Sequence, residues 1–306
     1  MREILAIVAT YNRKDLLDKC LNKLKNQTQP LDVLVIDNGS TDGTEQLIKI
    51  RYPDIIYFNT HINLGGAGAF NLGIKKGVML GYKYLWIMDD DTFPDEFALE
   101  NFIKVDKNLN GKYGFLASKV LWKDGSLCKM NIQKISKWKK LSNINTVEKI
   151  QFSSFVSLFI KSKTVLKYGL PYKDFFIWGD DTEFTRRISR NEDCYFVNDS
   201  VVFHWMKNNE PTNIANCSID RIDRFKFKIR NDVVVARLDG IVGFLFLLIH
   251  LLSDIIKIIF YSKNKTLKIT MLFKYTYKGV NFHPTIEYIT MEKQANCVRS
   301  QKSDRQ

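Results

Sequence analysis

The 306-residue sequence is poor in the residues that mark several protein classes. Six prolines and 16 glycines exclude collagen-like and low-complexity chains. The five cysteines are widely spaced and form no Cys-x-x-Cys pair, so we expect neither a disulfide scaffold nor a cysteine-rich zinc site. The first ten residues lack the apolar core and the cleavage site of a signal peptide, which predicts a cytoplasmic protein.

Apolar residues and positive charge are what the chain has in quantity. Hydrophobic residues make up 45% of it, which excludes disorder of the bulk of the chain. Lysine and arginine outnumber aspartate and glutamate by 46 to 33, and residues 206–306 hold 17 of these bases against 9 of the acids. Basic surfaces bind nucleic acids, anionic lipids or anionic substrates, and composition alone does not choose among them.

The first hundred residues alternate between strand and helix signals. Short apolar runs at 4–9, 33–36, 55–58 and 84–88 predict buried strands, and the stretches between them predict helices. This alternation predicts an α/β fold with a mostly parallel sheet and helices on both faces. Ligands bind such sheets at the carboxyl ends of the strands, where this chain places polar clusters.

The rest of the chain is less regular. We expect strands in 112–121, 152–160 and 195–204, an exposed excursion over 122–150, a short helix at 183–190, and helices from about 219 to 278. The chain therefore divides into a domain of residues 1–210 and a basic helical region of residues 211–306.

One apolar run stands out in the helical region. Residues 240–253 carry no formal charge, but a membrane-spanning helix needs about 20 residues, and Asp254 and Lys257 interrupt the continuation. With His250 these two form a polar stripe, and five lysines follow within 263–278. A buried core helix and a membrane-surface helix with a basic flank both fit this pattern, and a spanning helix fits it less well.

Three adjacent carboxylates, Asp89, Asp90 and Asp91, follow the strand at 84–88. Adjacent negative charges at a strand end are costly unless a cation neutralises them, and oxygen ligands suit Mg²⁺ or Mn²⁺. Side chains alternate along an extended chain, so Asp89 and Asp91 are the better metal pair. A solvated acidic turn that caps the next helix is the alternative.

A second acidic pair, Asp180 and Asp181, lies between an aromatic strand and a helix. A carboxylate near apolar rings can have a raised pKa and act as a general base. Asp181 or Thr182 could also cap the helix, and the two roles are compatible. His204 ends a strand. A lone histidine more often has a structural role, and His204 becomes a candidate site residue only if it lies close to the acidic cluster in the fold.

The segment NLGGAGAFN, residues 63–71, is a glycine turn that leads into a helix. Such turns let backbone N–H groups approach an anion. The segment is neither a dinucleotide fingerprint nor a P-loop, so by itself it is a weak signal.

Taken together, these motifs resemble one family. VATYNR, VIDNGSTDGT, NLGGAGAFNLG, WIMDDD, WGDDTEF and VFHW occur in this order over roughly residues 3–205. They resemble the family 2 glycosyltransferases of the GT-A fold, most of all the galactofuranosyltransferase and rhamnosyltransferase branch of bacterial cell-wall and O-antigen synthesis. The resemblance implies a donor and metal site in residues 1–110 and an acceptor and base part in residues 111–210.

The resemblance also implies roles for single residues. The nucleotide-sugar donor would contact Thr10, Tyr11, Arg13, Asp37, Asn63, Gly65, Asn71, Asp89 and Asp90. Asp89, Asp91 and His204 would hold the divalent ion, Mg²⁺ or Mn²⁺. Asp181, with Asp180 beside it, would be the general base, and Trp178 would shape the acceptor pocket. Residues 206–306 receive no role in this way.

The implied reaction is one inverting displacement, from UDP-galactofuranose or alternatively dTDP-rhamnose, onto a glycan or lipid-linked oligosaccharide. We expect the enzyme at the inner face of the cell membrane, with peripheral contact through its C-terminal region and no nucleic-acid partner. Three other interpretations stay open. A sugar-1-phosphate nucleotidyltransferase would need a glycine-rich first loop, a basic nucleic-acid-binding protein would need a recognised motif, and the intact acidic pairs argue against an inactive scaffold.

Overall fold

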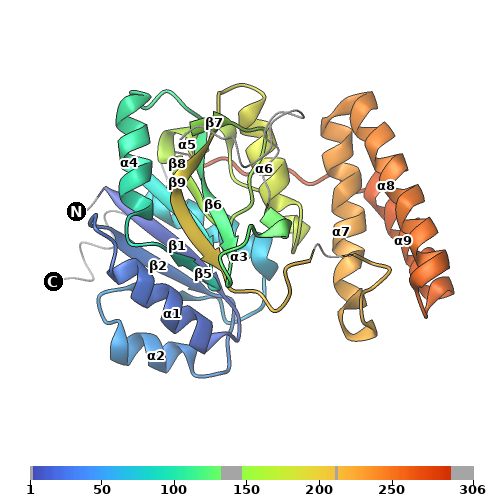
Figure 1. The fold of residues 1–306 in the computed structure, drawn as a ribbon, viewed down its shortest axis with the longest axis horizontal. Coiled ribbons are helices and arrows are strands. Elements are labelled where there is room, and N and C mark those ends of the chain that lie inside the picture. Colours follow the sequence, from blue (N-terminus) through green and yellow to red (C-terminus); the bar gives the residue numbers. More distant parts are fainter. Residues whose placement is uncertain (1–2, 132–146, 211–212, 291–306) are drawn as a thin grey trace.

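A sheet flanked by helices and a separate layer of C-terminal helices make up the computed structural model, which describes residues 3–131, 147–210 and 213–290 (Figure 1). The excursion predicted over 122–150 lies partly outside these residues. Within the described part of that stretch, η1 (Lys129–Asn131) and β7 (Val147–Lys149) are the ordered elements.

Within the described residues, the strands form one sheet in the order β3-β2-β1-β4-β8-β6-β9-β5, and β7 pairs with β9. The other strands span β1 (Ile4–Thr10), β2 (Asp32–Asp37), β3 (Ile56–Asn59), β4 (Tyr84–Asp89), β5 (Thr92–Pro94), β6 (Phe115–Trp122), β8 (Leu158–Lys161) and β9 (Tyr195–His204). β3, β2, β1 and β4 run parallel, which confirms the predicted parallel half. β8 then runs antiparallel between β4 and β6.

Helices cover both faces of the sheet, as predicted. They are α1 (Lys14–Lys25), α2 (Thr44–Arg51), α3 (Gly65–Met79), α4 (Ala98–Asn108), α5 (Ser162–Tyr168) and α6 (Asp180–Ser189). α1, α2 and α4 pack on the face that β1 lines with Ala6 and Val8, and α3, α5 and α6 pack on the face lined by Leu5 and Ile7. Because side chains alternate along a strand, a strand buried on both faces must be apolar throughout.

Three local predictions need correction, and one strand was not predicted. The predicted strand at 152–160 is reduced to Leu158–Lys161, α6 begins at Asp180 rather than 183, and 195–204 is one continuous strand. β5 was not predicted, because three residues are too few to show a period. Its pairing with β9 nevertheless sets Thr92 opposite His204 and so brings the acidic turn to the end of β9.

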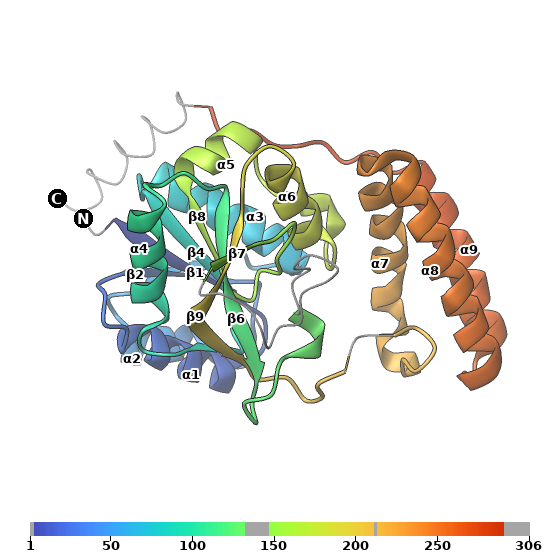
Figure 2. The same ribbon diagram turned by 45° about the horizontal axis from the view of Figure 1, so that its top comes forward.

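The C-terminal helices α7 (Ile219–Leu238), α8 (Gly240–Tyr261) and α9 (Lys265–Val280) confirm the predicted helical stretch and stand beside the sheet domain (Figure 2). α7 faces that domain and packs Val234 against Ala67 and Phe175. After α9 the chain returns along the sheet domain, where the carbonyl of Glu287 accepts a hydrogen bond of 2.8 Å from the Leu170 amide. The helical layer therefore contacts the sheet domain both through α7 and through the returning chain.

α3 begins in close contact with the loop before α6. Gly65 has a φ of +74°, and a Cβ atom at this position would lie 2.1 Å from the carbonyl oxygen of Phe176. The amide of Ala67 donates a hydrogen bond of 3.1 Å to the same oxygen. A glycine is therefore required at position 65, both by its backbone conformation and by the nearby carbonyl.

We predict that Gly65→Ala lowers the free energy of unfolding by on the order of 1–3 kcal/mol, the usual cost of such backbone strain. Urea unfolding followed by circular dichroism measures it. Gly66→Ala is the matched control, because a Cβ atom there meets nothing within 4 Å. Equal stability of the two variants would show that the close approach is unimportant.

Candidate active site

The loops after β1, β2 and β3 are tied to one another by short polar side chains. Asn12 Oδ1 accepts a hydrogen bond of 2.8 Å from the amide of Thr41. Asn38 donates to Asn63 Oδ1 at 3.0 Å and accepts from the amide of Leu64 at 2.8 Å. Asn12 and Asn38 were not among the predicted site residues, although Asn12 lies in the motif VATYNR and Asn38 in the motif VIDNGSTDGT.

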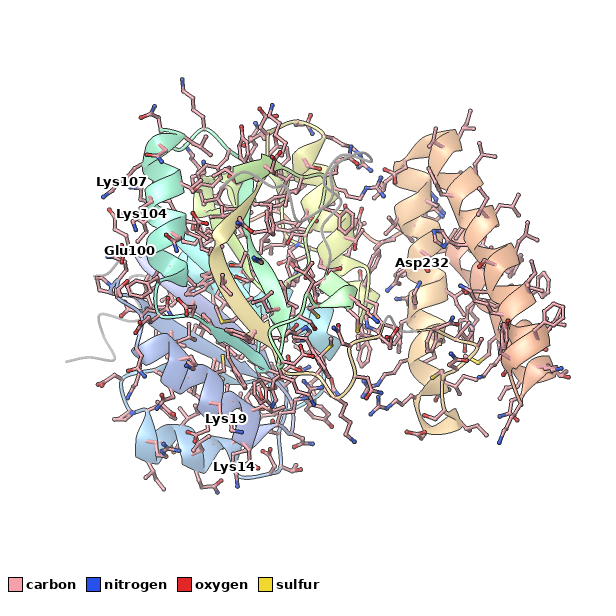
Figure 3. All side chains as sticks on the ribbon, in the orientation of Figure 1. Lys14, Lys19, Glu100, Lys104, Lys107 and Asp232 are labelled. Atoms are coloured by element: carbon pink, nitrogen blue, oxygen red, sulfur yellow. The ribbon has the colours of Figure 1, made fainter. Side chains whose placement is uncertain are left out.

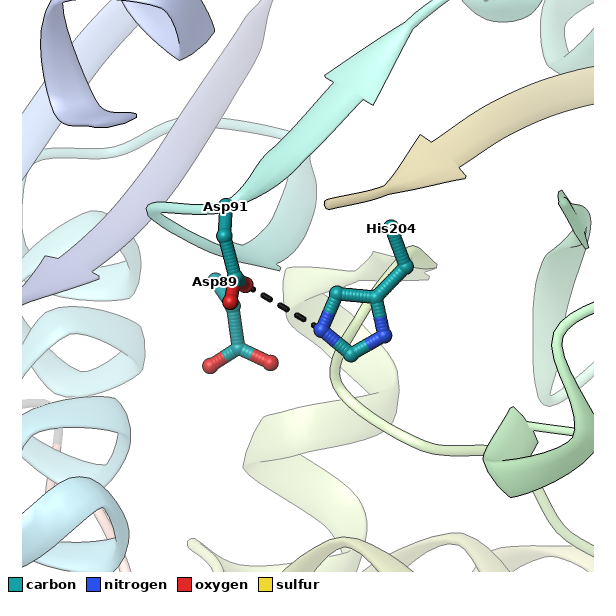
Figure 4. Close-up of side chains that lie close together, drawn as sticks. All are labelled: Asp89, Asp91 and His204. Carbon is teal, nitrogen blue, oxygen red and sulfur yellow. Dashed lines mark ion pairs between the residues drawn. The ribbon is translucent and has the colours of Figure 1, made fainter. Parts of the chain in front are cut away.

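The acidic turn and the end of β9 meet, as the resemblance implied (Figure 4). One ligand atom each from Asp89, Asp91 and His204 lies within 4.8 Å of the other two. His204 Nε2 is 3.1 Å from Asp91 Oδ1, yet that buried oxygen accepts no hydrogen bond within the described residues. The cluster therefore consists of two carboxylates and an imidazole that face one point.

Asp90 points to the other side of the turn. Its carboxylate accepts hydrogen bonds from Thr10 Oγ1 at 2.8 Å and from Arg13 at 3.2 Å. The same Arg13 nitrogen lies 2.7 Å from Asp91. Thr10 and Arg13, both predicted as donor contacts, thus hold the acidic turn against the first loop.

Burial makes the charged forms of these carboxylates unfavourable. It raises the pKa of Asp89 to about 7, with a further contribution from the charge of Asp91, and it raises the pKa of Asp90 to about 7 against the opposing effect of Arg13. Burial acts on Asp91 as well, but His204 and Arg13 outweigh it and lower the pKa of Asp91. The cluster is therefore short of positive charge.

Asn131 determines how His204 presents its ring. His204 Nδ1 lies 2.9 Å from Asn131 Oδ1, while Asn131 Nδ2 donates to Ser154 at 2.8 Å, so the amide oxygen faces the ring. Burial lowers the pKa of His204, but Asp91 and Asp89 outweigh it and raise that pKa to about 10, so the ring must lose its Nε2 proton before it can hold a cation. In that neutral form Nδ1 keeps its proton for Asn131, and the lone pair of Nε2 points toward Asp91. Asn131 was not predicted, since nothing in its sequence neighbourhood indicates contact with β9.

The second acidic pair begins α6. Asp180 is buried and Asp181 is half-buried, and both amide and hydroxyl of Thr182 donate to Asp181 Oδ1, at 2.6 and 3.2 Å. Burial raises the pKa of both carboxyls, and for Asp180 the charges of Asp181 and Asp89 add to the effect. The N-cap is Gly179, so neither Asp181 nor Thr182 is the N-cap, although Asp181 does accept a hydrogen bond from the Thr182 amide in the first turn.

Two predicted residues have local partners that the sequence did not reveal. Asp37 is fully buried and accepts hydrogen bonds from the Ser40 amide at 2.8 Å and the Tyr57 hydroxyl at 2.6 Å. Asn71 donates to the Pro171 carbonyl at 2.7 Å. Their contacts with a nucleotide stay predictions.

Two predicted contacts lie nearer the surface. Tyr11 is 44% exposed beside the first loop. Trp178 packs its ring on Phe225 of α7, with 5.4 Å between the ring centres. Their roles toward donor and acceptor also stay predictions.

The site thus combines a cluster able to hold a divalent cation with a pair of carboxyls able to accept a proton. Carboxylate and imidazole ligands together suit a first-row divalent ion such as Mn²⁺. The raised pKa values show that added positive charge would stabilise the ionised forms. Such a pairing of cation and base serves transfer from a phosphorylated donor.

Comparison with known sequences agrees with this chemistry. A sequence model of the family described as Glycosyl transferase family 2 matches residues 5–112. The galactofuranosyltransferase GlfT1 of Mycolicibacterium smegmatis is 24% identical over 198 residues, which cover 61% of this chain and 66% of that protein. The chain thus spans just under two thirds of the length of the curated relatives it matches.

Solved structures share the architecture. TarS 1–349 from S. aureus has a TM-score of 0.55 at 14% identity, over 92% of this chain and 72% of that chain. The mannosyltransferase PcManGT from Pyrobaculum calidifontis, in complex with GDP-Man and Mn²⁺, has a TM-score of 0.53 at 14% identity, over 98% and 79%. These likenesses confirm the expected GT-A fold. The family match includes the loops after β1 and β2 and the whole acidic turn, so residues 5–112 form a domain of the kind described as Glycosyl transferase family 2.

Proposed function

We propose that this chain is an inverting, metal-dependent glycosyltransferase that transfers galactofuranose from UDP-galactofuranose to a glycan or lipid-linked acceptor. The observation that carries the proposal is the cluster of Asp89, Asp91 and His204 beside the carboxyl pair at the start of α6. Relatives named as galactofuranosyltransferases support the choice of sugar, and dTDP-rhamnose is the alternative donor. A donor panel with a lipid-linked acceptor, analysed by mass spectrometry, tests it, and no transfer from any donor would refute it.

The cluster fits a divalent cation on three grounds. Asp91 has a buried oxygen without a hydrogen bond, the three ligand atoms converge, and Asn131 turns the Nε2 lone pair of His204 toward them. The imidazole ligand favours Mn²⁺ over the harder Mg²⁺. A bound ion would stabilise the charge that develops on the diphosphate leaving group.

We predict that Asp91→Asn abolishes transfer and weakens Mn²⁺ binding by more than about 100-fold, since loss of supporting contacts alone costs 10–100-fold. Electron paramagnetic resonance measures free Mn²⁺ directly. Asp90→Asn is the comparison, because Asp90 bonds to Thr10 and Arg13 instead of facing the cluster, and its Mn²⁺ affinity should change far less. Full turnover of the wild type in excess EDTA would contradict the proposal.

Asp181 is better placed than Asp180 to act as the base. It is the more exposed of the two, and both hydrogen bonds described for it go to Oδ1, so Oδ2 can take the proton of an acceptor hydroxyl. The hydroxyl oxygen then attacks the donor carbon as its bond to the diphosphate breaks. Asp180 is buried and feels the charge of Asp89, which suits a supporting position.

We predict that Asp181→Asn lowers kcat by about 10²–10⁴-fold with little change in donor affinity. The wild-type rate should fall on acidification with an apparent pKa above the ordinary aspartate value of about 3.9, because the base must be ionised and burial raises the pKa of Asp181. Steady-state kinetics across pH measures both. A variant that mainly loses donor binding would instead assign the role to Asp180.

α8 carries its apolar side chains on the outside. Its exposed large apolar residues are Ile241, Val242, Phe244, Leu245, Phe246, Leu248, Ile249, Leu252, Ile256, Ile259, Phe260 and Tyr261. The outer faces of α1 and α4, by contrast, carry charges such as Lys19 and the ion pair of Glu100 with Lys104 (Figure 3). The alternative of a buried core helix is therefore wrong for α8.

Of the polar stripe of α8, Asp254 is half-buried, whereas His250 and Lys257 are exposed. Burial raises the pKa of Asp254, and nearby Lys228 of α7 opposes the shift. Within the described residues α8 is the one helix long and apolar enough to cross a membrane, longer than the 14-residue run suggested. α7 packs along it, however, and carries nine charged residues between 219 and 238, so we propose that α8 lies in the plane of a membrane surface.

Four of the five lysines in 263–278 can flank such a surface. Lys268 cannot, because it is buried and donates to the carbonyls of Ala215 and Cys217 at 2.8 and 2.9 Å. Lys263, Lys265, Lys274 and Lys278 are exposed. Each would add on the order of 1 kcal/mol near anionic lipid at low salt.

We predict that Phe244→Glu/Leu248→Glu abolishes co-sedimentation with anionic vesicles, because both side chains are about half exposed on α8. Salt should release only part of the wild type, since apolar burial supplies most of the affinity. Ile50→Glu is the control, an apolar residue of α2 that is 78% exposed. Wild-type protein that never sediments with vesicles would defeat the membrane proposal.

A further inference from the structure

The segment that leads into Asp180, residues 174–179, has an uncommon backbone. Phe176 and Trp178 have φ angles of 64° and 65°, and Gly179 follows at 89°. A residue with a side chain in this region costs of order 1–3 kcal/mol and persists only where its surroundings hold it. The segment must therefore be held by contacts from outside itself.

α7 supplies most of these contacts through one buried amide. Asn231 is fully buried, and its Nδ2 group lies within hydrogen-bond distance of the carbonyls of Phe175, Ile177 and Trp178, at 3.0, 3.2 and 2.8 Å. Its Oδ1 accepts from Arg230 at 2.9 and 3.0 Å, which fixes the orientation of the amide.

Arg230 and α3 hold the other carbonyls. Arg230 donates to the carbonyls of Asp174 and Phe175 at 2.7 and 3.2 Å. The Phe176 carbonyl accepts from the amide of Ala67, at the start of α3. Every carbonyl from Asp174 to Trp178 therefore accepts a hydrogen bond, and four of the five have a donor on α7.

We propose that Asn231 is a positioning residue of the active site, which holds segment 174–179 so that the carboxyl pair at the start of α6 faces the metal cluster. The proposal rests on the proposed function. In this proposal the C-terminal helices support the active site in addition to contacting a membrane, because Asn231, which holds segment 174–179, belongs to α7.

Asn231→Asp is the sharpest test. It keeps the size of the side chain and an oxygen for Arg230, but replaces the donor that faces three carbonyls with an acceptor. We expect kcat to fall about 10²-fold, the cost of misplacing catalytic groups by about 1 Å, while Mn²⁺ affinity stays unchanged because Asn231 touches none of the three cluster residues. Asn281→Asp is the matched control on the same helical layer, since Asn281 is exposed.

A second readout does not depend on activity. Hydrogen–deuterium exchange of amides 174–181 should rise in Asn231→Asp and not in Asn281→Asp. If the wild type transfers no sugar from any donor, the proposed function fails, and this exchange still decides whether Asn231 holds the segment.

Unchanged kcat in a folded Asn231→Asp protein would overturn the proposal. If that variant does not fold, Arg230→Lys replaces it, because Lys cannot reach two carbonyls and the Asn231 amide together. We expect kcat to fall in folded Arg230→Lys, with Mn²⁺ affinity unchanged. Full activity of this variant would show that the contact serves stability alone, and would overturn the proposal.

Discussion

The concentration of buried carboxylates at one edge of the sheet is the constraint on which the site depends. Asp89, Asp90 and Asp91 follow β4 directly, and Asp180 feels the charge of Asp89 from the start of α6. Burying an ionised carboxylate without a partner is unfavourable, and the positive charges of Arg13 and of protonated His204 offset part of this desolvation penalty. What these cations leave unbalanced is the reason the cluster suits a divalent ion and an anionic donor held by it.

The two halves of the site come from different parts of the chain. The parallel half of the sheet brings the first three loops together, and Asn12 and Asn38 join them into one surface. The part of the site that we propose to receive the acceptor follows segment 174–179, whose backbone is held by α3 on one side and α7 on the other. A GT-A sheet alone does not complete this site, since the helical layer supplies part of its support.

Much of this could be predicted from the sequence, because strong local periods encode it. The apolar runs at 4–9 and 84–88 required strands buried on both faces, and the carboxylates had to follow at their carboxyl ends. The meeting of His204 with Asp91 came from family resemblance, since it depends on the pairing of three-residue β5 with β9. Asn131 and Asn231 escaped prediction because each acts across more than 50 residues of sequence, through side chains that look like ordinary polar positions. The outward apolar face of α8 was ambiguous for a similar reason, because periodicity shows that a helix has two faces and does not show which one is covered.

The central claim is that one general base and one divalent ion, held by Asp89, Asp91 and His204, carry out a single displacement. The measurement that tests it most directly is the anomeric configuration of the newly formed linkage, determined by nuclear magnetic resonance on product made from UDP-galactofuranose. A single displacement predicts that the configuration at the transferred carbon is inverted relative to the donor, in wild type and in any slow Asp181→Asn product alike. Retention of configuration would require a covalent intermediate or an internal return step, and would contradict the account.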